Sequence, residues 1–377
     1  MSRTGKQRNI LDFTLSSLLR RKGRNAALIV VYAFVVFLLA SVVFLAQSIK
    51  EEAQAVLREA PEIVVQRLVA GRHDLIPETY IDRIRGIPGV QSAKARLWGY
   101  YYEPLNGANY TVIADENFPY GKRTIVIGNG VARHLPPLVG KTMPMRSYDG
   151  SYLFMRIRET LSSESELVSS DLVLMSVDDF RELFRIPAGV GTDLVLSVRN
   201  PREVATVAGK IVEVLPDTRP ITRAEVLRTY DAVFDWRGGM IVANLLGALM
   251  AFVIFAWDKA TGLSAEERRE IGILKGLGWE TSDVILMKFW EGVVVSLSSF
   301  FLGVILAYVH VYFASATLFE SALKGWSVLY PDFRLKPVIT PYLVSVLFFL
   351  TVVPYTFATV VPSWRAATTD PDAVMRA

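Results

Sequence analysis

The chain has 377 residues, of which 51% are hydrophobic, and this composition excludes an ordinary soluble protein of the same length. The formal net charge of +4 is concentrated at one end, because the first 25 residues carry seven Lys or Arg against one acid, Asp12, and this +6 leaves −2 for the remainder. A nucleic-acid-binding surface is therefore not expected. The absence of cysteine excludes disulfides and thiolate sites, and three separated histidines give little support to a metal site.

Residues 1–25 are expected to form a cytoplasmic amphipathic elbow. Between Asn9 and Arg24, leucines fall on one helical face and a basic cluster follows them. Residues 26–46 carry no charged side chain and are long enough to cross a hydrocarbon layer of about 30 Å, so they are predicted to be the first membrane span. A cleaved signal peptide is the alternative, although its apolar region would be shorter, roughly 7–15 residues.

Residues 47–237 are expected to form an α+β extracytoplasmic domain between the first and second spans. The composition is that of a globular domain, and no apolar run in it could cross a membrane. Helix-like and strand-like patterns alternate along it. The segments predicted to be helices are Lys50–Arg58, Pro77–Gly89, Asp178–Phe184 and Pro201–Leu215, and Ile63–Val69 and Asp193–Val198 are predicted to be strands.

Three further spans are predicted in the second half, which makes the fold an α-helical membrane protein with four transmembrane helices. They are residues 238–257, 292–319 and 337–364. A charged segment 258–291 and an extracytoplasmic loop 320–336 separate them, and a cytoplasmic tail 365–377 follows the last span. The basic N-terminal segment and the basic residues of 258–291 place both termini and this segment in the cytoplasm. In the second span, Ala243, Gly247 and Ala251 recur every four residues, a pattern typical of helix packing within a subunit or of a dimer contact.

The charged segment 258–291 contains the strongest candidate for an interaction site. On a helix, Ile271, Leu274 and Leu277 form an apolar stripe, and Gly278 is suited to close that helix in a left-handed conformation, with Thr281 or Ser282 capping the next one. Such a short helix cannot build a core of its own, so its apolar face is expected to contact either the bilayer surface or another protein. The mixed charge of the segment, with no excess of Lys and Arg, favours a protein. Four charged residues border the stripe: Glu267, Arg268, Glu270 and Lys275.

The sequence from Glu267 to Gly278, followed by Glu291, resembles the coupling segment of FtsX-like permeases. These are membrane subunits of the type VII ABC transporters, the MacB, LolC/LolE and FtsX group. The end of the chain, with Pro362, Arg365-Ala366 and Asp370-Pro371, resembles the same family. Ile127-Gly128 and Val131–Leu135 resemble, more weakly, part of the MacB-like periplasmic core domain.

This resemblance implies a permease that binds no cofactor and catalyses no reaction, and the chain has no complete phosphate-binding loop. A separate cytoplasmic ABC ATPase dimer would hold ATP and Mg and would dock on Glu267, Arg268, Glu270, Ile271, Leu274, Lys275, Leu277 and Gly278. Other implied partners are a second permease copy or paralogue, membrane lipid, and a periplasmic adaptor or substrate protein.

Export or extraction of a lipophilic or lipoprotein-like substrate across the cell inner membrane is the function expected from the size of the outer domain. Mechanotransmission to a periplasmic or cell-wall enzyme without transport is the alternative within the family. A non-ABC membrane receptor would share the topology, and a membrane-embedded hydrolase would need polar catalytic residues within the spans, where His310 is the one histidine.

Overall fold

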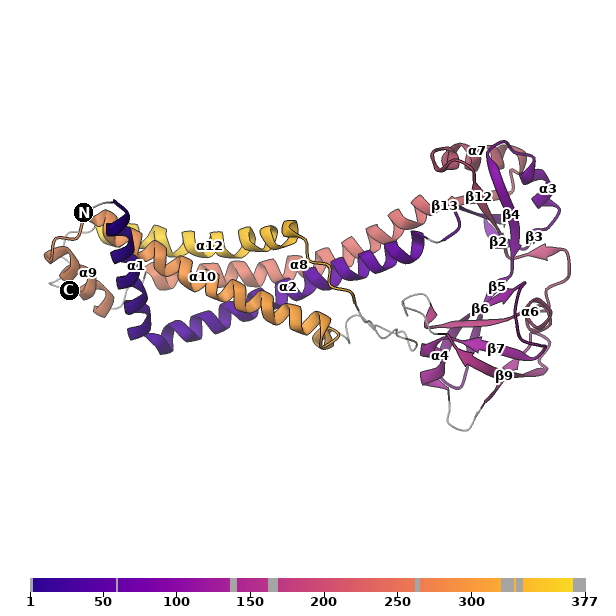
Figure 1. Cartoon of the computed structure of the whole chain (residues 1–377), viewed down its shortest axis with the longest axis horizontal. Helices are drawn as coiled ribbons and strands as arrows, with labels where there is room; N and C mark the ends of the chain where they lie inside the picture. Colours follow the sequence, from indigo (N-terminus) through magenta and orange to yellow (C-terminus); the bar gives the residue numbers. More distant parts are fainter. Residues whose placement is uncertain are drawn as a thin grey trace. The chain divides into compact units, whose positions relative to one another are not determined.

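The computed structural model describes residues 3–58, 60–135, 141–161, 169–261, 265–319, 329 and 335–368, and for some residues within helices it describes the backbone alone. The chain divides into two compact units. The helical unit comprises Met1–Ser48, Asp235–Thr317 and Lys336–Ala377, and the outer unit comprises Ile49–Phe234 and Leu318–Leu335 (Figure 1).

Long helices make up the helical unit, and two of them continue into the outer unit (Figure 1). Helix α1 begins the helical unit and ends at Arg20. A turn at Arg21 separates α1 from α2, so the predicted continuation of the elbow helix to Arg24 was wrong. The bounds are α1 (Arg3–Arg20), α2 (Lys22–Arg58), α8 (Arg223–Thr261), α9 (Ala265–Gly276), α10 (Thr281–Tyr312), η3 (Thr317–Phe319) and α12 (Pro341–Thr368).

Three of these helices are long and apolar enough to cross a membrane, judged on the described residues. They contain the segments Lys22–Glu52 of α2, Thr281–Tyr312 of α10 and Pro341–Val360 of α12. The other predicted span, residues 238–257, lies within the continuous helix α8, where many side chains are outside the described part. The described residues thus contain three candidate spans, and the fourth span stays a prediction.

Tyr32 of α2 is the point where three helices meet. Its ring is fully buried and stacks on Phe252 of α8, with centroids 4.6 Å apart, and on Tyr355 of α12, with centroids 4.9 Å apart. Its hydroxyl donates a hydrogen bond of 2.5 Å to the carbonyl of Thr351 in α12. A buried phenol needs such a partner, so the aromatic stack and the hydrogen bond together fix α2 against α12.

Close backbone approach holds α10 against α2. A Cβ atom at Gly303 would lie 2.7 Å from the carbonyl oxygen of Ala33 and 2.7 Å from Cβ of Val36, so glycine is the residue that fits there. The Ser299 hydroxyl donates to the carbonyl of Ile29 at 3.2 Å, and toward the other end of α10 a ring nitrogen of His310 lies 3.2 Å from the Ser41 hydroxyl. Small residues and hydroxyl groups of this kind are typical of helix contacts in membranes.

The first sheet of the outer unit has the order β13-β1-β12-β4, with β2 paired to β1. Its strands pair antiparallel, and two helices pack against one face through a buried aliphatic cluster that includes Ile63, Ile84, Leu196 and Ile211. The elements are β1 (Ile63–Val69), β2 (Arg72–Asp74), β4 (Val90–Arg96), β12 (Asp193–Val198), β13 (Thr218–Thr222), α3 (Tyr80–Arg85), η2 (Pro201–Glu203) and α7 (Val204–Val214).

The second sheet has the order β5-β6-β10-β7-β9-β8 and mixes parallel and antiparallel pairs. Alternate residues of all six strands point into one core, to which Leu329, from the segment after α10, contributes a buried side chain. The elements are β5 (Trp98–Glu103), β6 (Ala108–Asp115), β7 (Thr124–Ile127), α4 (Asn129–His134), β8 (Thr142–Arg146), β9 (Tyr152–Thr160), β10 (Leu172–Ser176) and α6 (Val177–Phe184).

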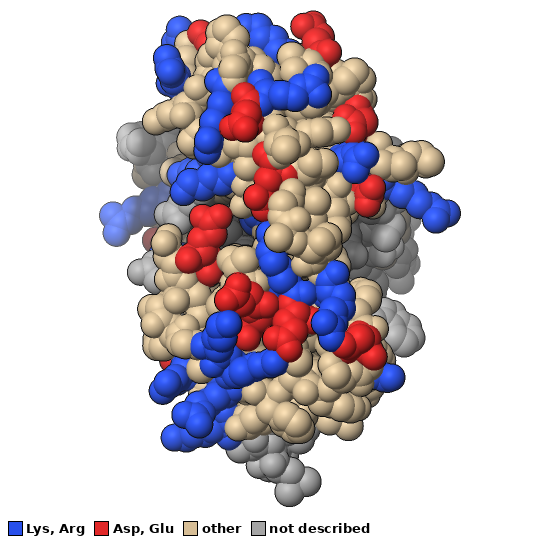
Figure 2. All heavy atoms as spheres, turned by 90° about the vertical axis from the view of Figure 1, so that its right-hand side faces the viewer, with Lys and Arg blue, Asp and Glu red and all other residues tan. Residues whose placement is uncertain are grey.

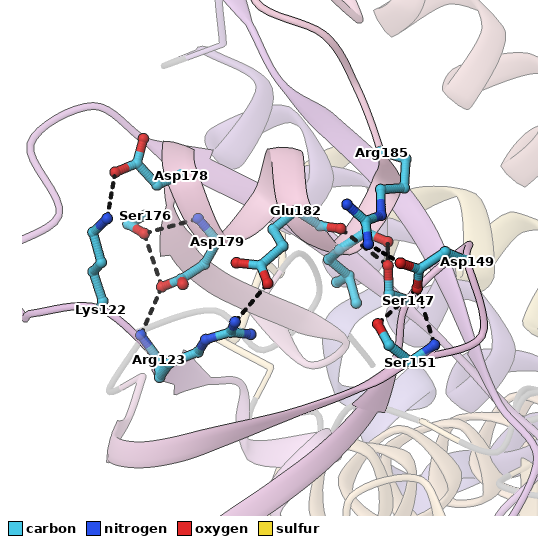
Figure 3. A network of polar contacts seen from close by, with 11 residues as sticks. Lys122, Arg123, Ser147, Asp149, Ser151, Ser176, Asp178, Asp179, Glu182 and Arg185 are labelled. Atoms are coloured by element: carbon cyan, nitrogen blue, oxygen red, sulfur yellow. Dashed lines mark hydrogen bonds and ion pairs between the residues drawn. The ribbon is translucent and has the colours of Figure 1, made fainter.

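Helix α6 is tied to this sheet at both ends (Figure 3). At its N-terminus the buried Asp179 carboxylate accepts hydrogen bonds from the Ser176 hydroxyl at 2.8 Å and from the backbone N–H of Arg123 at 2.9 Å. At its C-terminus Arg185 pairs with Asp149 of the β8–β9 turn. The network fixes the position of a structural helix and brings no catalytic group into a cleft.

One predicted helix is shorter in the structure than the sequence indicated. Helix α3 covers Tyr80–Arg85, whereas Pro77–Gly89 was predicted, because the chain before it forms the strand β3 (Ile76–Pro77). This strand pairs with β11 (Val190–Gly191) as a small two-stranded sheet. At the other end, Gly89 has φ +103°, a left-handed backbone conformation that cannot continue the helix.

An ion pair with a buried carboxylate joins the two sheets of the outer unit. The Asp193 carboxylate, 1% exposed, accepts from Arg96 Nε at 2.9 Å and from Arg96 Nη2 at 2.7 Å. The indole N–H of Trp98 donates to the same carboxylate at 2.8 Å. Because Arg96 ends β4 of one sheet and Trp98 begins β5 of the other, Asp193 fixes the angle between them.

Candidate functional site

Helices α9 and α10 form a helix-turn-helix in which the end of α9 is tightly defined. The backbone N–H of Trp279 donates to the carbonyl of Leu274 and that of Gly278 to the carbonyl of Lys275, both at 3.0 Å. Gly278 has φ +92°, in the left-handed region that glycine adopts at low cost. These two bonds are the Schellman arrangement, which satisfies the last carbonyls of the helix and turns the chain sharply.

The start of α10 is capped by a residue that the sequence did not indicate. Glu280 is the N-cap, and its side chain accepts from the backbone N–H of Asp283, while the Asp283 carboxylate accepts from the backbone N–H of Glu280 at 3.2 Å. Thr281 or Ser282 had been predicted as the cap, and that prediction was wrong. Two carboxylates three residues apart can satisfy both amides, which is why the helix begins one residue earlier.

The apolar stripe of α9 is divided between two environments. Ile271 and Leu274 are 7% and 5% exposed, and they pack against side chains of α1 and α10 in the same chain. Leu277 is 75% exposed. Ile273, which lies four residues before it on the same face of the helix, is 55% exposed. The buried cluster consists of Ile10, Ile271, Leu274, Val284 and Met287. Ile273 was missed from the sequence because it lies outside the predicted stripe.

The charged residues around the stripe differ in what they contact. Glu270 binds two arginines at the junction of α1 and α2: Arg20 at 3.0 Å and Arg21 at 2.8 Å. Lys275 is half-buried. Glu267 and Arg268 lie within α9, but their side chains are outside the described residues.

A second ion pair holds α1 to the beginning of α10. Lys6 Nζ lies 2.8 Å from the Asp283 carboxylate and 4.0 Å from that of Glu280. The hydrogen bond with Asp283 raises the pKa of the Lys6 amine above its ordinary value, and the surrounding carboxylates act in the same direction. Between the two ion pairs, the rings of Phe13 and Trp279 are in contact, with centroids 5.2 Å apart. These contacts were not predicted, because they join residues far apart in the sequence.

The small residues predicted for helix contacts lie on an open part of α8. Ala243, Gly247 and Ala251 are all exposed, and a Cβ atom at Gly247 would meet nothing within 4 Å. Nearby on the same helix, Met250 and Ile254 are more than 60% exposed. In a single copy of the chain this face therefore has no packing partner among the described residues.

The described residues offer no metal site, since no group of three or more His, Cys, Asp or Glu side chains is placed to hold an ion in that part of the chain. On the face of the outer unit seen in Figure 2, basic and acidic side chains lie close to one another. Two ion pairs of the outer unit are Lys122 with Asp178 and Arg123 with Glu182.

One comparison with known proteins, a match to a family, concerns a segment in the second half of the chain. Residues 240–371 match the family described as FtsX-like permease C-terminal. No curated protein matches the sequence.

Among solved structures, the chain is similar to the extracellular domain of the noncanonic ABC-type transporter YknZ from Gram-positive bacteria, with 13% identity, a TM-score of 0.29 and coverage of 42% of this chain and 99% of that one. It is also similar to the periplasmic region of MacB from Actinobacillus actinomycetemcomitans, with 8% identity, a TM-score of 0.30 and coverage of 45% and 92%. Residues 240–371, the segment that contains α9, α10 and α12, are thus similar to the FtsX-like permease C-terminal family.

Proposed function

We propose that this chain is the permease subunit of an ABC transporter and that a separate cytoplasmic ATPase dimer supplies the energy. In this proposal α2, α8, α10 and α12 are four spans of the inner membrane, and both termini lie in the cytoplasm with α9. The outer unit lies on the other side of the membrane. The family of residues 240–371 and the basic N-terminal segment support this arrangement.

The observation that carries the proposal is the exposed apolar pair Leu277 and Ile273 at the end of α9. The opposite side of this helix is already used, since Ile271 and Leu274 are buried against α1 and α10. An exposed leucine and isoleucine on a rigidly capped helix are suited to enter a groove of another protein. Complete burial of such side chains contributes about 1.5–3 kcal/mol each, which is enough to make them hot spots of an interface.

The ATPase dimer would hold ATP and Mg, and its closure would move α9 together with the helices attached to it. A second copy of the permease or a paralogue would face the first through the open side of α8 at Ala243, Gly247 and Ala251. Small residues allow the close helix approach that association in a bilayer requires. Membrane lipid and a periplasmic adaptor or substrate protein complete the proposed set of partners.

We infer that the work is done by the outer unit, which would export or extract a lipophilic or lipoprotein-like substrate. The space between α2, α8 and α12 is filled by the stacked rings of Tyr32, Phe252 and Tyr355. A pathway for polar solutes usually needs ionisable groups inside the membrane, and this aromatic contact provides none. Substrate entry from the bilayer or at the outer unit agrees better with a filled helical unit. Transmission of force to a periplasmic enzyme would use the same parts.

Co-purification tests the docking step. Leu277→Asp and Ile273→Asp should each remove the ATPase from the detergent-solubilised permease, because a carboxylate would be buried in an apolar contact without a partner. Leu105→Asp is the matched control, since Leu105 is a leucine of the outer unit with a similar exposure, 74%. Retention of an ATPase by both α9 variants would contradict the proposed docking face, and loss of the ATPase from the Leu105 variant would show a non-specific effect.

A further inference from the structure

We propose that α1 is a strut that locks the docking helix α9 to the first span, and that Glu270 is the positioning residue of this lock, holding α9 to Arg20 and Arg21. This inference rests on the proposed function, because it assigns the path by which movement of α9 reaches the spans. It also removes Glu270 from the surface that an ATPase would contact. The sequence alone had placed Glu270 on the border of that surface.

The first support is the use of both carboxylate oxygens of Glu270 within the chain. Oε1 lies 3.0 Å from Arg20 Nη2, and Oε2 lies 2.8 Å from Arg21 Nη2. The Ser17 hydroxyl lies 3.5 Å from Oε1, at the limit of hydrogen bonding. The Glu270 side chain is 27% exposed, so the pairs are partly protected from solvent. Charge-assisted bonds of this length are stronger than neutral ones and fix an orientation.

The position of the two arginines connects α9 to the junction of α1 and α2. Arg21 is the one residue between α1 and α2, so a contact with it acts directly before the first residue of α2. The same corner is closed by the Asn25 side-chain amide, which donates to the carbonyl of Leu18 at 3.0 Å, and by the Asn25 backbone N–H, which donates to the carbonyl of Arg21 at 3.1 Å. A displacement of α9 would therefore pull on a stiff corner and not on a flexible linker.

Two more contacts hold α1 to the neighbouring helices. Ile10 is 4% exposed and lies in the same apolar cluster as Ile271 and Leu274 of α9. Near the other end, Lys6 binds the Asp283 carboxylate at 2.8 Å. The middle of the strut thus lies in an apolar cluster with both α9 and α10, its last turn binds α9 and its first turn binds α10. One rigid helix connects the docking element to α2 and to α10 together.

Spin labelling of the full-length protein in lipid nanodiscs tests the strut without an ATPase. The chain has no native cysteine, so a nitroxide on Leu277→Cys reports the motion of α9 alone. Glu270→Arg should shift the spectrum toward the mobile component, because it replaces two attractive pairs by repulsion. Arg20→Glu with Arg21→Glu should give the same shift, and the triple variant with all three charges exchanged should return toward the native spectrum.

Asp12→Arg is the control, since Asp12 is an exposed residue of α1 and its substitution changes the charge by the same amount as Glu270→Arg. It should leave the spectrum unchanged. Unchanged mobility in Glu270→Arg, or no recovery in the triple variant, would overturn the strut.

Co-purification of the ATPase, measured on unlabelled variants with Leu277 intact, separates this inference from the proposed function. Glu270→Arg should retain the ATPase, because Leu277 and Ile273 are still exposed, and it should lose ATP-driven transport, which the triple variant recovers. Loss of the ATPase from Glu270→Arg as complete as that from Leu277→Asp, without recovery in the triple variant, would make Glu270 a contact of the partner and contradict the inference. Absence of an ATPase from the native protein would contradict the proposed function while the spectra still decided the strut.

Discussion

Two carboxylates, Asp193 in the outer unit and Glu270 in the helical unit, bind arginine at similar distances but in different surroundings. Asp193 accepts hydrogen bonds from two nitrogens of one guanidinium and from the indole N–H of Trp98, and its side chain is 1% exposed. Glu270 binds two separate arginines and is 27% exposed. Burial decides how permanent each contact is, because removing one partner of a buried pair costs about 3–5 kcal/mol, whereas exposed pairs contribute roughly 0–1 kcal/mol.

The difference agrees with the roles proposed for the two regions. The Asp193 contact fixes the angle between two sheets, so the outer unit would move as one body. The Glu270 contact joins α9 to the start of α2, so the two would move together during a transport cycle. Because this pair is partly solvated, breaking it should cost less than breaking the Asp193 contact.

The largest effect is expected for Asp193→Ala. This change removes the acceptor of three hydrogen bonds, two from Arg96 and one from the Trp98 indole, so the outer unit should lose about 3–5 kcal/mol of stability. Urea unfolding of the full-length protein in detergent, followed by hydrogen exchange in β12, measures it. The control is Asp74→Ala, since Asp74 pairs with Arg67 but is 51% exposed. Equal losses in the two variants would break the comparison between buried and exposed carboxylates.

A smaller effect extends the same contrast from charges to helix packing. Gly303→Val would force a side chain into the carbonyl of Ala33 and the side chain of Val36, and should cost about 1–3 kcal/mol by overpacking. Gly209→Val is the control, because this glycine of α7 also lies in a helix and has open space around it. Thermal unfolding in detergent should show a lower midpoint for the first variant and little change for the second. A reversed order would contradict the described packing of α10 on α2.

A third carboxylate, Asp217, extends the comparison because its side chain is 36% exposed, more than those of Asp193 and Glu270. Burial alone would raise its pKa, but hydrogen bonds from Arg67 at 3.0 Å and from the Tyr80 hydroxyl at 2.9 Å outweigh burial and lower it. The bond to Asp217 is also the main reason that the pKa of Tyr80 is raised.

The sign of each shift gives the smallest predicted effect, a loss of stability at both ends of the pH range. The Asp217 contribution is present above its unfolded pKa of about 3.9 and is lost as the pH falls through the lower folded value. The Tyr80 contribution is present below about pH 10 and is lost as the pH rises through the raised folded value. In Asp217→Asn, the unfolding midpoint should depend less on pH at both the acid and the alkaline end. An unchanged dependence on pH would contradict the assignment of these two effects to Asp217 and Tyr80.

The sequence was informative where a pattern is local. Uncharged runs indicate the long helices, and Gly278 is a recognisable end of α9 because only a few neighbouring residues decide it. The burial of Ile271 and Leu274 could not be predicted in the same way, since a stripe of apolar residues does not say whether the chain itself or a partner covers it. The structure divides that stripe, and Leu277 with Ile273 remains on the outside.

The ion pairs were unpredictable for a different reason. Arg96 and Asp193 are 97 residues apart in the sequence, and Arg21 and Glu270 are 249 apart. Each of these residues is ordinary in its local context, and only the fold brings the partners together. The same holds for Gly303. Only the close approach of α2 to α10 explains why no residue with a side chain fits at this position.

Photo-crosslinking at the end of α9 tests the central claim most directly. A photoreactive phenylalanine analogue placed at Leu277 in intact cells should give, on illumination, a covalent product between this chain and a protein with an ABC ATPase domain. The same analogue at Leu105 should not. Products from position 277 that contain only lipid or a second copy of the chain, with no ATPase, would contradict the account of α9 as the docking helix.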